Sequence, residues 1–554
     1  MQEISQFITK VVKELFGVDE PAELTIPDEK FGDYSTNIAL KLAGKLQKNP
    51  RSLAEDIATA LGSASQIKRA TVAGPGFINL VLEDTYLASL WTLETPGKYK
   101  GQTVIAEYSD PNTFKALHAG HLYTTLVGNA IANIVEQSGA KVYRLNYGGD
   151  VGLHVARAMW GIVNYLGGEH PEKLSTIALS ERAEWVSQRY VEGNTAYEKD
   201  GIEKQEVQEF NKKVYAIHEE GDRQSSFAQI YWICRQWSYD GFEKLYAELG
   251  VKPFDEYIPE SLVTPLGQKT VKKGLEQGVF EISDGAVVYP EAKSGLHTRV
   301  FITSRGLPTY EAKELGLATY KWQKYKFDKS LVITANDITE YMKVLFSAIA
   351  NFYPEVEQRT THLTHGMIKL TGGRKMSSRK GNVLMAGDII SDAIAANEKF
   401  SGKQDDSVAI GAIKYAFLKQ RIGGDIIYDP EESVSLQGNS GPYLQYAHAR
   451  ARSILEKSTA ENATKLEDLT VHERSLARAL SHYQMVLEKA VDEFMPHHIC
   501  TYLYELAQVF NRFYENSKVV GDEREAIRRR LVGQYADTLK TGLETLGISA
   551  PNKM

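Results

Sequence analysis

The sequence is poor in cysteine and in long apolar runs, and each shortage excludes a class of protein. Its 554 residues include two cysteines, Cys234 and Cys500, which lie far apart and form no CxxC pair. A disulfide framework is therefore excluded, and we expect no cysteine-built zinc site. No apolar stretch reaches the length of a membrane span, and residues 1–16 lack the layout of a signal peptide. We therefore expect a cytoplasmic protein without membrane association.

Strong charge of one sign, internal repeats and low-complexity tracts are also missing. The net charge of −7 argues against wholesale non-specific binding of nucleic acid, although a local basic face is compatible with it. Hydrophobic residues make up 43% of the chain, which is enough for sizeable cores. The length suggests about three or four domains.

The pattern of predicted helices and strands divides the chain into four parts. Residues 1–95 predict a mixed α and β unit. Residues 96–385 alternate strands with helices, which is typical of a parallel α/β sheet, and a helical, charged insertion interrupts them at about 165–295. A connecting helical segment at 386–430 leads into an all-α unit at 431–554, where we expect helices at 441–457, 471–490, 498–517 and 524–546.

Four strands and one helix are expected in the central α/β sheet region. It should begin with a strand at 103–109, a helix at 121–137 and a strand at 141–146. We expect VFIT (300–303) and SLVITAN (330–336) to resume the sheet after the insertion.

The segment His118-Ala119-Gly120-His121 lies where the first predicted strand leads into its helix. A helix N-terminus favours phosphate, and Gly120 leaves room for a nucleotide because it has no side chain. The imidazoles of His118 and His121 can donate hydrogen bonds to phosphate oxygens. We predict an ATP site that activates a substrate as its adenylate. Surface or helix-capping histidines are the alternative interpretation.

A second motif, GGRKMSSRKGN, spans 372–382. Its glycines permit movement, and Arg374, Lys375, Arg379 and Lys380 supply four positive charges. A mobile basic loop can close over a triphosphate and stabilise the pyrophosphate leaving group. Alone, the motif is equally compatible with a solvated basic loop. Its pairing with HxGH favours the ATP role.

The two motifs resemble the HIGH and KMSKS motifs of class I aminoacyl-tRNA synthetases, and their surroundings are similar to those of arginyl-tRNA synthetases. The likeness touches every part of the chain, most weakly the insertion. It implies a split Rossmann-like parallel-sheet catalytic domain between an N-terminal tRNA-contacting α+β domain and a C-terminal all-α anticodon-binding domain. The segments that carry it, besides the motifs, are EYSDPNTFKALHAGHL (107–122), GPYLQYAHARARSI (441–454), FGDYSTNIALKLA (31–43), AGPGFINL (73–80) and the terminal LETLGISAPNKM.

The resemblance also implies a reaction. ATP, accompanied by Mg2+, would activate L-arginine as arginyl-adenylate, and the arginyl group would pass to the 3′ end of tRNA(Arg). Alignment and electrostatics would drive both steps without a covalent enzyme intermediate. We expect no dedicated metal site on the protein, and we expect a monomer. Whether activation requires bound tRNA stays open.

The same resemblance assigns ATP binding and catalysis to residues of the two motifs. Ser378 stands where KMSKS has its second lysine, and the resemblance implies that Lys115, three residues before HxGH, supplies the missing charge. Lys380 is a rival for that role, and Lys115 is otherwise an exposed loop lysine. The implied ATP-site residues are His118, Gly120, His121, Lys375, Met376, Ser377 and Ser378, with Lys115 beside them.

Arginine recognition is implied for Glu107, Asn112, Tyr310 and Glu314. A guanidinium presents five donors in a rigid fork, which suits paired carboxylates. Tyr310 and Glu314, four residues apart, would share one helical face. On spacing alone, surface charges are the simpler interpretation of the two glutamates, and the family match favours binding.

Two positions depart from the family pattern. Val151 replaces the tryptophan of a GDWG segment, and Ile338 stands near an expected glutamine. They leave the reaction class intact but affect the expected packing around arginine.

Three residues of the helical domain match family positions at the anticodon: Tyr443, Tyr446 and Met554. Aromatic side chains stack on splayed bases, although core packing explains the tyrosines equally well. The run Arg528-Arg529-Arg530 suits either phosphate contact or a solvated face.

Three other functions compete with arginine ligation. A cofactor-forming HxGH nucleotidyltransferase would have no use for the helical C-terminal domain. A class I synthetase for lysine fits the acidic pocket less well, because an ammonium lacks the planar fork. A non-catalytic tRNA-binding relative would not be expected to keep His118, Gly120, His121 and Lys375.

Overall fold

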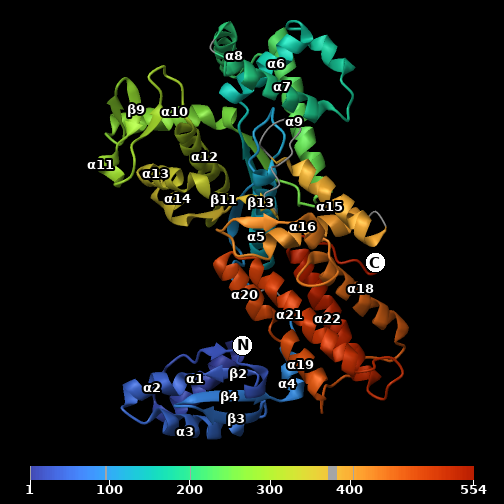
Figure 1. The fold of residues 1–554 in the computed structure, drawn as a ribbon. Coiled ribbons are helices and arrows are strands. Elements are labelled where there is room, and N and C mark those ends of the chain that lie inside the picture. The colour runs from blue at the N-terminus through green and yellow to red at the C-terminus, as the bar shows by residue number, and fades with distance from the viewer. Residues whose placement is uncertain (1, 94–96, 200, 372–383, 403–404) are drawn as a thin grey trace.

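The computed structural model describes residues 2–93, 97–199, 201–371, 384–402 and 405–554. Figure 1 shows an elongated molecule with the N-terminal unit at one end, helices in the middle and an α/β domain at the other end. The C-terminus lies near the middle, close to helices α16 (Asp406–Leu418) and α18 (Gly441–Lys457). Within the described residues, no helix is both long enough and apolar enough to span a membrane.

The N-terminal unit packs helices against a four-stranded antiparallel sheet with the strand order β1-β2-β4-β3. In its first helix, Ile4, Ile8, Val11 and Val12 recur at helical spacing and are buried, as the sequence pattern predicts. Its elements are α1 (Gln2–Phe16), β1 (Leu24–Thr25), η1 (Glu29–Phe31), β2 (Tyr34–Thr36), α2 (Ile38–Leu46), α3 (Pro50–Gly62), β3 (Ile67–Ala73), β4 (Phe77–Leu82) and α4 (Asp84–Ser89).

The catalytic sheet has five parallel strands in the order β12-β11-β5-β6-β7. The chain moves outward from β5 in both directions, so a topological switch point lies between β5 and β11, where ligands bind at the carboxyl ends of strands. Helices α5 (Ala119–Gln137) and α12 (Tyr310–Tyr325) cover opposite faces. The strands are β5 (Thr103–Glu107), β6 (Lys141–Gly148), β7 (Glu256–Pro259), β11 (Lys329–Ala335) and β12 (Thr360–His365).

Two expectations about this sheet were wrong. The predicted strand at 300–303 is β10 (Arg299–Ile302), which belongs to a separate antiparallel sheet with β9 (Ala286–Tyr289) and β8 (Glu281–Ser283). Strand β7, within the expected insertion, returns the chain to the main sheet instead. It is a four-residue edge strand, too short to show the alternation that marks a longer strand.

The helices that connect the strands of the main sheet therefore fall into two groups. The first follows β6 and consists of α6 (Leu153–Leu166), η2 (Pro171–Thr176), α7 (Arg182–Tyr197), α8 (Ile202–Glu219) and α9 (Ser226–Glu248). The second group follows β7 and accompanies the second half of the sheet, with α10 (Glu260–Glu276), α11 (Glu291–Ser294), η3 (Asn336–Ile338), α13 (Thr339–Ala350) and α14 (Pro354–Arg359).

Helices dominate the rest of the chain, as predicted. A short parallel pair, β13 (Ile368–Leu370) with β14 (Ile426–Tyr428), joins the connecting segment to the catalytic domain. The expected helix at 471–490 is two helices, α19 and α20, which are separated at Ser481 and His482. The remaining elements are α15 (Ala386–Ser401), α17 (Pro430–Ser433), α19 (Val471–Leu480), α20 (Tyr483–Glu493), α21 (His497–Asn516) and α22 (Glu525–Thr545).

The N-terminal unit docks on α19. Arg474 Nη2 lies 2.7 Å from Asp33 Oδ2, and Arg474 also pairs with Asp84. Trp91 Nε1 donates to the Ala477 carbonyl at 2.8 Å. The N-terminal unit is thus held by charges and hydrogen bonds against the helical domain.

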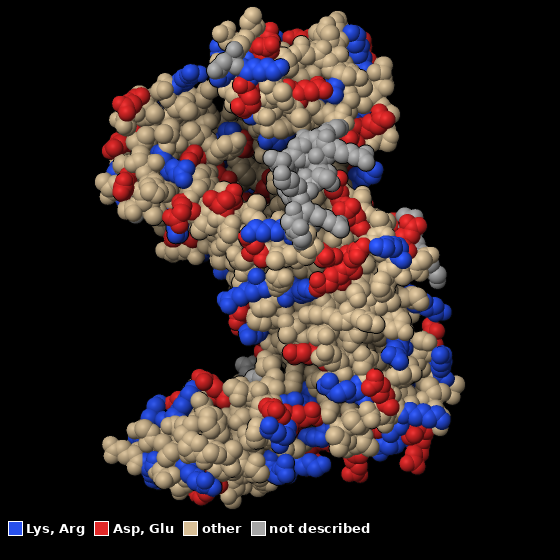
Figure 2. All heavy atoms as spheres, in the orientation of Figure 1, with Lys and Arg blue, Asp and Glu red and all other residues tan. Residues whose placement is uncertain are grey.

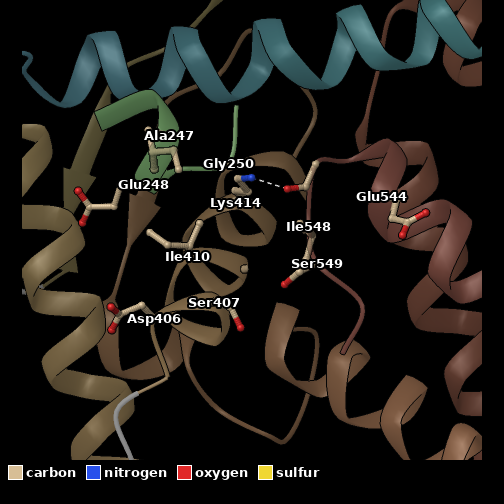
Figure 3. A pocket seen from close by; sticks show the side chains of 13 residues that line it. Ala247, Glu248, Gly250, Asp406, Ser407, Ile410, Lys414, Glu544, Ile548 and Ser549 are labelled. Carbon is tan, nitrogen blue, oxygen red and sulfur yellow. Dashed lines mark hydrogen bonds between the residues drawn. The ribbon is translucent and has the colours of Figure 1, made fainter. Parts of the chain in front are cut away.

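The helical domain in turn meets the catalytic domain at a cavity of about 440 Å³ between the end of α9, helix α16 and the residues after α22. Figure 3 shows Lys414 in this cavity, donating to the Gly547 carbonyl. Burial lowers the pKa of Lys414 to about 8. Beside it, Asn133 of α5 donates to the Thr545 carbonyl at 3.2 Å, so α5 touches the last turn of α22 directly.

Candidate active site

The HxGH segment forms the N-terminus of α5 directly after the β5 loop. His118 is the N-cap, and its Nδ1 accepts hydrogen bonds from the backbone N–H groups of Gly120 at 3.1 Å and His121 at 3.4 Å. His121 Nδ1 accepts in return from the His118 N–H at 3.3 Å. A Cβ on Gly120 would lie 2.9 Å from His118 Cε1. Glycine is therefore needed here for the cap as well as for any nucleotide.

These caps determine the protonation of the two histidines. Burial lowers the pKa of His118 and of His121, and the nearby positive charge of Lys115 lowers both further. The rings stack with centroids 3.8 Å apart, which disfavours two charged imidazoles. Because each Nδ1 accepts a backbone hydrogen bond, each neutral ring carries its proton on Nε2. Helix capping and a donor role toward phosphate are therefore compatible.

The segment that follows the second motif returns to HxGH. The Ala119 N–H donates to the Leu384 carbonyl at 2.8 Å, and the Ala386 N–H donates to the Leu117 carbonyl at 2.9 Å. The motif residues Lys375, Met376, Ser377 and Ser378 lie outside the described residues, as do Arg374, Arg379 and Lys380. Their predicted ATP contacts stay predictions.

The helical insertion holds the loop before HxGH. Ser238 Oγ accepts from the Phe114 N–H at 3.0 Å, and Ser187 Oγ accepts from the Ala116 N–H at 3.1 Å. Between them, Lys115 Nζ lies 4.5 Å from the centroid of the Tyr190 ring. Lys115 is therefore positioned by a cation–π contact beside the two histidines rather than being a freely exposed lysine.

A cluster of largely buried acidic residues, called here the acidic pocket, lies at the carboxyl ends of β5 and β6, under α12. Glu107, the last residue of β5, is 3% exposed, and its Oε2 accepts from Lys321 Nζ at 2.6 Å. Burial, followed by the charge of Glu107, raises the pKa of Glu314 to about 8. The predicted glutamates thus share one pocket, and Glu107 is not a surface charge.

Sequence reasoning missed Lys321 and Asp110 in this pocket. Lys321 lies seven residues after Glu314 on α12, two helical turns along the same face, so the spacing would have revealed it. Asp110 is partly buried, and burial together with the charge of Glu107 raises its pKa well above the usual range. Among the described residues, no group of three His, Cys, Asp or Glu side chains is arranged to hold a metal ion.

The other residues expected around arginine have distinct surroundings. Asn112 Oδ1 accepts from the Gly149 N–H at 3.0 Å and so fastens the β5 loop to the β6 loop. Tyr310 begins α12 and is 57% exposed. Val151 is buried in the apolar core of the insertion with Phe114, and Ile338 is partly buried at the end of η3.

The residues expected at the anticodon lie along α18. Tyr443 is partly buried and accepts from Asn511 Nδ2 at 2.7 Å, whereas Tyr446 is 46% exposed. The C-terminal residues follow α18, and Lys553 Nζ lies 3.8 Å from Glu456 Oε2. Ten residues of helix separate Tyr446 from Glu456, about 15 Å of rise, so the tail places Met554 toward the other end of α18.

The arginine run in α22 has a structural use. Arg528 Nε donates to Glu473 at 2.8 Å. Arg529 donates to backbone carbonyls at the end of α18, and Arg530 donates to backbone carbonyls of the loop after it. The run therefore ties loops to the helical bundle.

Comparison with known families agrees with this architecture. Residues 92–429 match the catalytic domain of class I (R) tRNA synthetases, 444–554 match the DALR anticodon binding domain, and 2–82 match the arginyl tRNA synthetase N terminal domain. The fold and the site thus define a class I aminoacyl-tRNA synthetase, as the motifs predicted.

Individual relatives span the whole chain. Arginine–tRNA ligases of Crocosphaera subtropica and Flavobacterium psychrophilum are each 30% identical to it, covering 100% and 91% of this chain and 98% and 90% of their own lengths. The arginyl-tRNA synthetase structures from Thermus thermophilus (TM-score 0.80, 24% identity, 100% of both chains) and Plasmodium falciparum (TM-score 0.79, 21% identity, 100% and 99%) share its fold. The chain belongs to the arginyl-tRNA synthetase family, whose activity is the ligation of arginine to tRNA(Arg).

Proposed function

We propose that this chain carries out arginine ligation with the residues assembled at its switch point. ATP and L-arginine form arginyl-adenylate and pyrophosphate, and the arginyl group then passes to the 3′ end of tRNA(Arg). The observation that carries the proposal is the HxGH cap at the N-terminus of α5, on the loop that follows the buried Glu107 at the end of β5.

His118 and His121 act on the phosphates of ATP. Their Nε2–H groups donate to oxygens that gain charge as the α-phosphorus is attacked, while the α5 N-terminus attracts the same charge. Lys115, held against Tyr190, adds a fixed positive charge from the opposite wall. Gly120, Lys375, Met376, Ser377 and Ser378 complete the proposed ATP site.

Arginine occupies the acidic pocket. The carboxylates of Glu107 and Glu314 receive the guanidinium donors, Asn112 shapes the floor through Gly149, and Tyr310 stands at the entrance. A lysine substrate would use fewer of these acceptors, because its ammonium is a point charge without a planar fork.

Transfer RNA extends over the remaining domains. Residues 1–95 contact it, residues 96–385 hold the catalytic site, residues 386–430 connect, and residues 431–554 read the anticodon. Tyr446, exposed on α18, suits stacking on a splayed base, and Tyr443 and Met554 are proposed anticodon contacts. The enzyme works as a cytoplasmic monomer, with Mg2+ brought by ATP.

Exchange of labelled pyrophosphate into ATP tests the assignment, measured with arginine or lysine, each with and without tRNA(Arg). We expect arginine alone among the two amino acids to support exchange. His121→Asn should lower kcat about a hundredfold, the usual scale for removing a donor to a developing anion. The control His170→Asn changes an exposed histidine of the insertion and should leave kcat unchanged. An exchange rate that does not depend on arginine, with or without tRNA(Arg), would overturn the proposal.

A further inference from the structure

The loop after β5 bends through an unfavourable backbone conformation. Ser109 has φ 76° and Asp110 has φ 46°, in the left-handed region that side chains other than glycine rarely adopt. Such a conformation persists only where its surroundings impose it. Ser109 Oγ is hydrogen-bonded to Tyr246 at 2.7 Å and accepts from Thr125 Oγ1 at 2.7 Å. The loop is thus held in its bend from two helices.

The bend directs the Asp110 carboxylate to the end of β6. Asp110 Oδ1 accepts from the Tyr147 N–H at 2.8 Å, one strand away from Glu107. Strands β5 and β6 are parallel, with Glu107 in register with Leu145. Because side chains alternate along a strand, Tyr147 lies on the same sheet face as Leu145, the face that α12 and Glu314 cover.

The pocket on this face contains polar groups without partners. Among the described residues, the buried hydroxyls of Tyr147 and Tyr341 have no hydrogen-bond partner, and Tyr147 is only 8% exposed. Burial, followed by the charges of Glu260, Glu314 and Glu107, raises the pKa of Tyr147. Burial, followed by the charge of Glu314, raises the pKa of Tyr341, so both rings lie near these carboxylates. These two hydroxyls are therefore available to a ligand that enters beside the carboxylates.

The charges in the pocket leave room for a cation. Glu107, Asp110 and Glu314 contribute three carboxylates, and Lys321 contributes one ammonium, which is paired with Glu107. When all four groups are ionised, the pocket carries a charge of −2, which one guanidinium reduces to −1. Among the described residues, Lys321 pairs with Glu107, so the carboxylates of Asp110 and Glu314 can pair with a positive charge on the substrate.

We propose that Asp110 is a further specificity-determining residue, whose carboxylate selects the charged guanidinium of arginine together with Glu107 and Glu314. The inference rests on the proposed function and adds a residue to its amino-acid site. The strained loop and the Tyr147 N–H position the Asp110 carboxylate. The positive charge of Lys321 reduces the repulsion between this carboxylate and that of Glu107.

The test compares arginine with citrulline, which carries an uncharged urea in place of the guanidinium. Asp110→Asn keeps an oxygen for the Tyr147 N–H but removes the charge. We expect the KM for arginine to rise about tenfold, the scale of one charged contact, while the KM for ATP and the inhibition constant of citrulline change little. Asp110→Glu retains the charge and should retain most of the preference for arginine over citrulline.

Asp255→Asn is the matched control. Asp255 Oδ2 accepts at 2.7 Å from the N–H of Arg144, which lies in β6 as Tyr147 does, but Asp255 lies outside the pocket. It should leave both amino-acid constants unchanged. An unchanged arginine KM in Asp110→Asn would overturn the role of Asp110. So would an equal rise in the arginine KM and the citrulline inhibition constant. Either outcome would leave the proposed function standing. Wild-type protein without arginine-dependent exchange would overturn the proposed function, and this inference with it.

Discussion

At the scale of single residues, α12 carries lysines whose ion pairs have equal length and different surroundings, and Lys321 and Lys324 are two of them. Lys321 Nζ lies 2.6 Å from Glu107, with both side chains less than a tenth exposed. Lys324 Nζ lies 2.6 Å from Glu256, and its side chain is 45% exposed. The pair therefore separates the effect of burial from that of geometry.

We expect Lys321→Met to lower the free energy of unfolding by about 3–5 kcal/mol, because it leaves a buried carboxylate uncompensated. Lys324→Met should cost less than about 1 kcal/mol, because water screens an exposed pair. Urea unfolding of both variants at neutral pH measures the difference. Equal losses would show that the buried pair contributes no more than the exposed one.

Glu314 predicts a pH dependence of arginine binding. Its pKa of about 8 favours a proton on Glu314 near neutrality, which a cationic substrate bound at the proposed site would displace. Glu107, Glu260 and Glu311 favour this proton and Lys321 opposes it. The KM for arginine should therefore fall as the pH rises toward 8, by at most about tenfold per pH unit. Steady-state kinetics measure it, and Glu314→Gln should reduce the slope to the part that Asp110 contributes. A KM that rises over this range would contradict the assignment.

At the scale of elements, the C-terminal tail packs against α18 and supplies hydrogen-bond acceptors to its buried side chains. Gln445 Nε2 donates to the Ser549 carbonyl at 3.0 Å, and His448 Nδ1 lies 2.8 Å from the Pro551 carbonyl. Both side chains of α18 are fully buried, so the tail supplies partners that water cannot reach.

Two truncations distinguish packing from RNA binding. Deletion of 549–554 should lower the free energy of unfolding by about 1–3 kcal/mol for each buried group left without a partner. Deletion of Met554 alone, which is 46% exposed, should change it by less than about 0.5 kcal/mol and raise only the KM for tRNA(Arg). Denaturation curves and aminoacylation kinetics measure the two effects. A destabilised Met554 deletion would assign that residue to packing.

At the scale of the whole molecule, His482 connects pH to the docking of the N-terminal unit. It lies at the break between α19 and α20, and its ring meets Tyr34 edge-on at 6.2 Å. Burial, then the charge of Arg478, lowers the pKa of His482 to about 3 from an ordinary value of 6.5. The docked state thus favours the neutral ring.

Because this pKa is lowered in the folded state, the stabilisation is complete above about pH 6.5 and is lost as the pH falls toward 3. The loss is at most about 1.4 kcal/mol per pH unit. His482→Gln should therefore lose less stability than the wild type between about pH 6.5 and about pH 5. Chemical denaturation across this range checks the difference. Parallel losses in both proteins would exclude His482 as the titrating group.

Much of the architecture could be predicted because it depends on local patterns. The expected helix at 441–457 is α18 to the residue, and the strand expected at 330–336 is β11 within one residue. Strand β7 escaped prediction and β10 was assigned to the wrong sheet, since each has four residues and its sheet is decided by distant partners. The break between α19 and α20, within 471–490, lies where Tyr34 of the N-terminal unit contacts His482, a contact between segments distant in sequence.

The sequence by itself determined the class of enzyme, because HxGH, the basic loop motif and their neighbours are contiguous residues whose chemistry can be read in order. Only the tertiary structure decided which charges meet. Lys321 lies 214 positions from Glu107 and Lys115 lies 75 from Tyr190, yet these contacts fix the charge beside Glu107 and the position of Lys115 near the two histidines. Burial, which sets the pKa of each histidine and carboxyl group, arises from packing among distant segments, so no local pattern contains it.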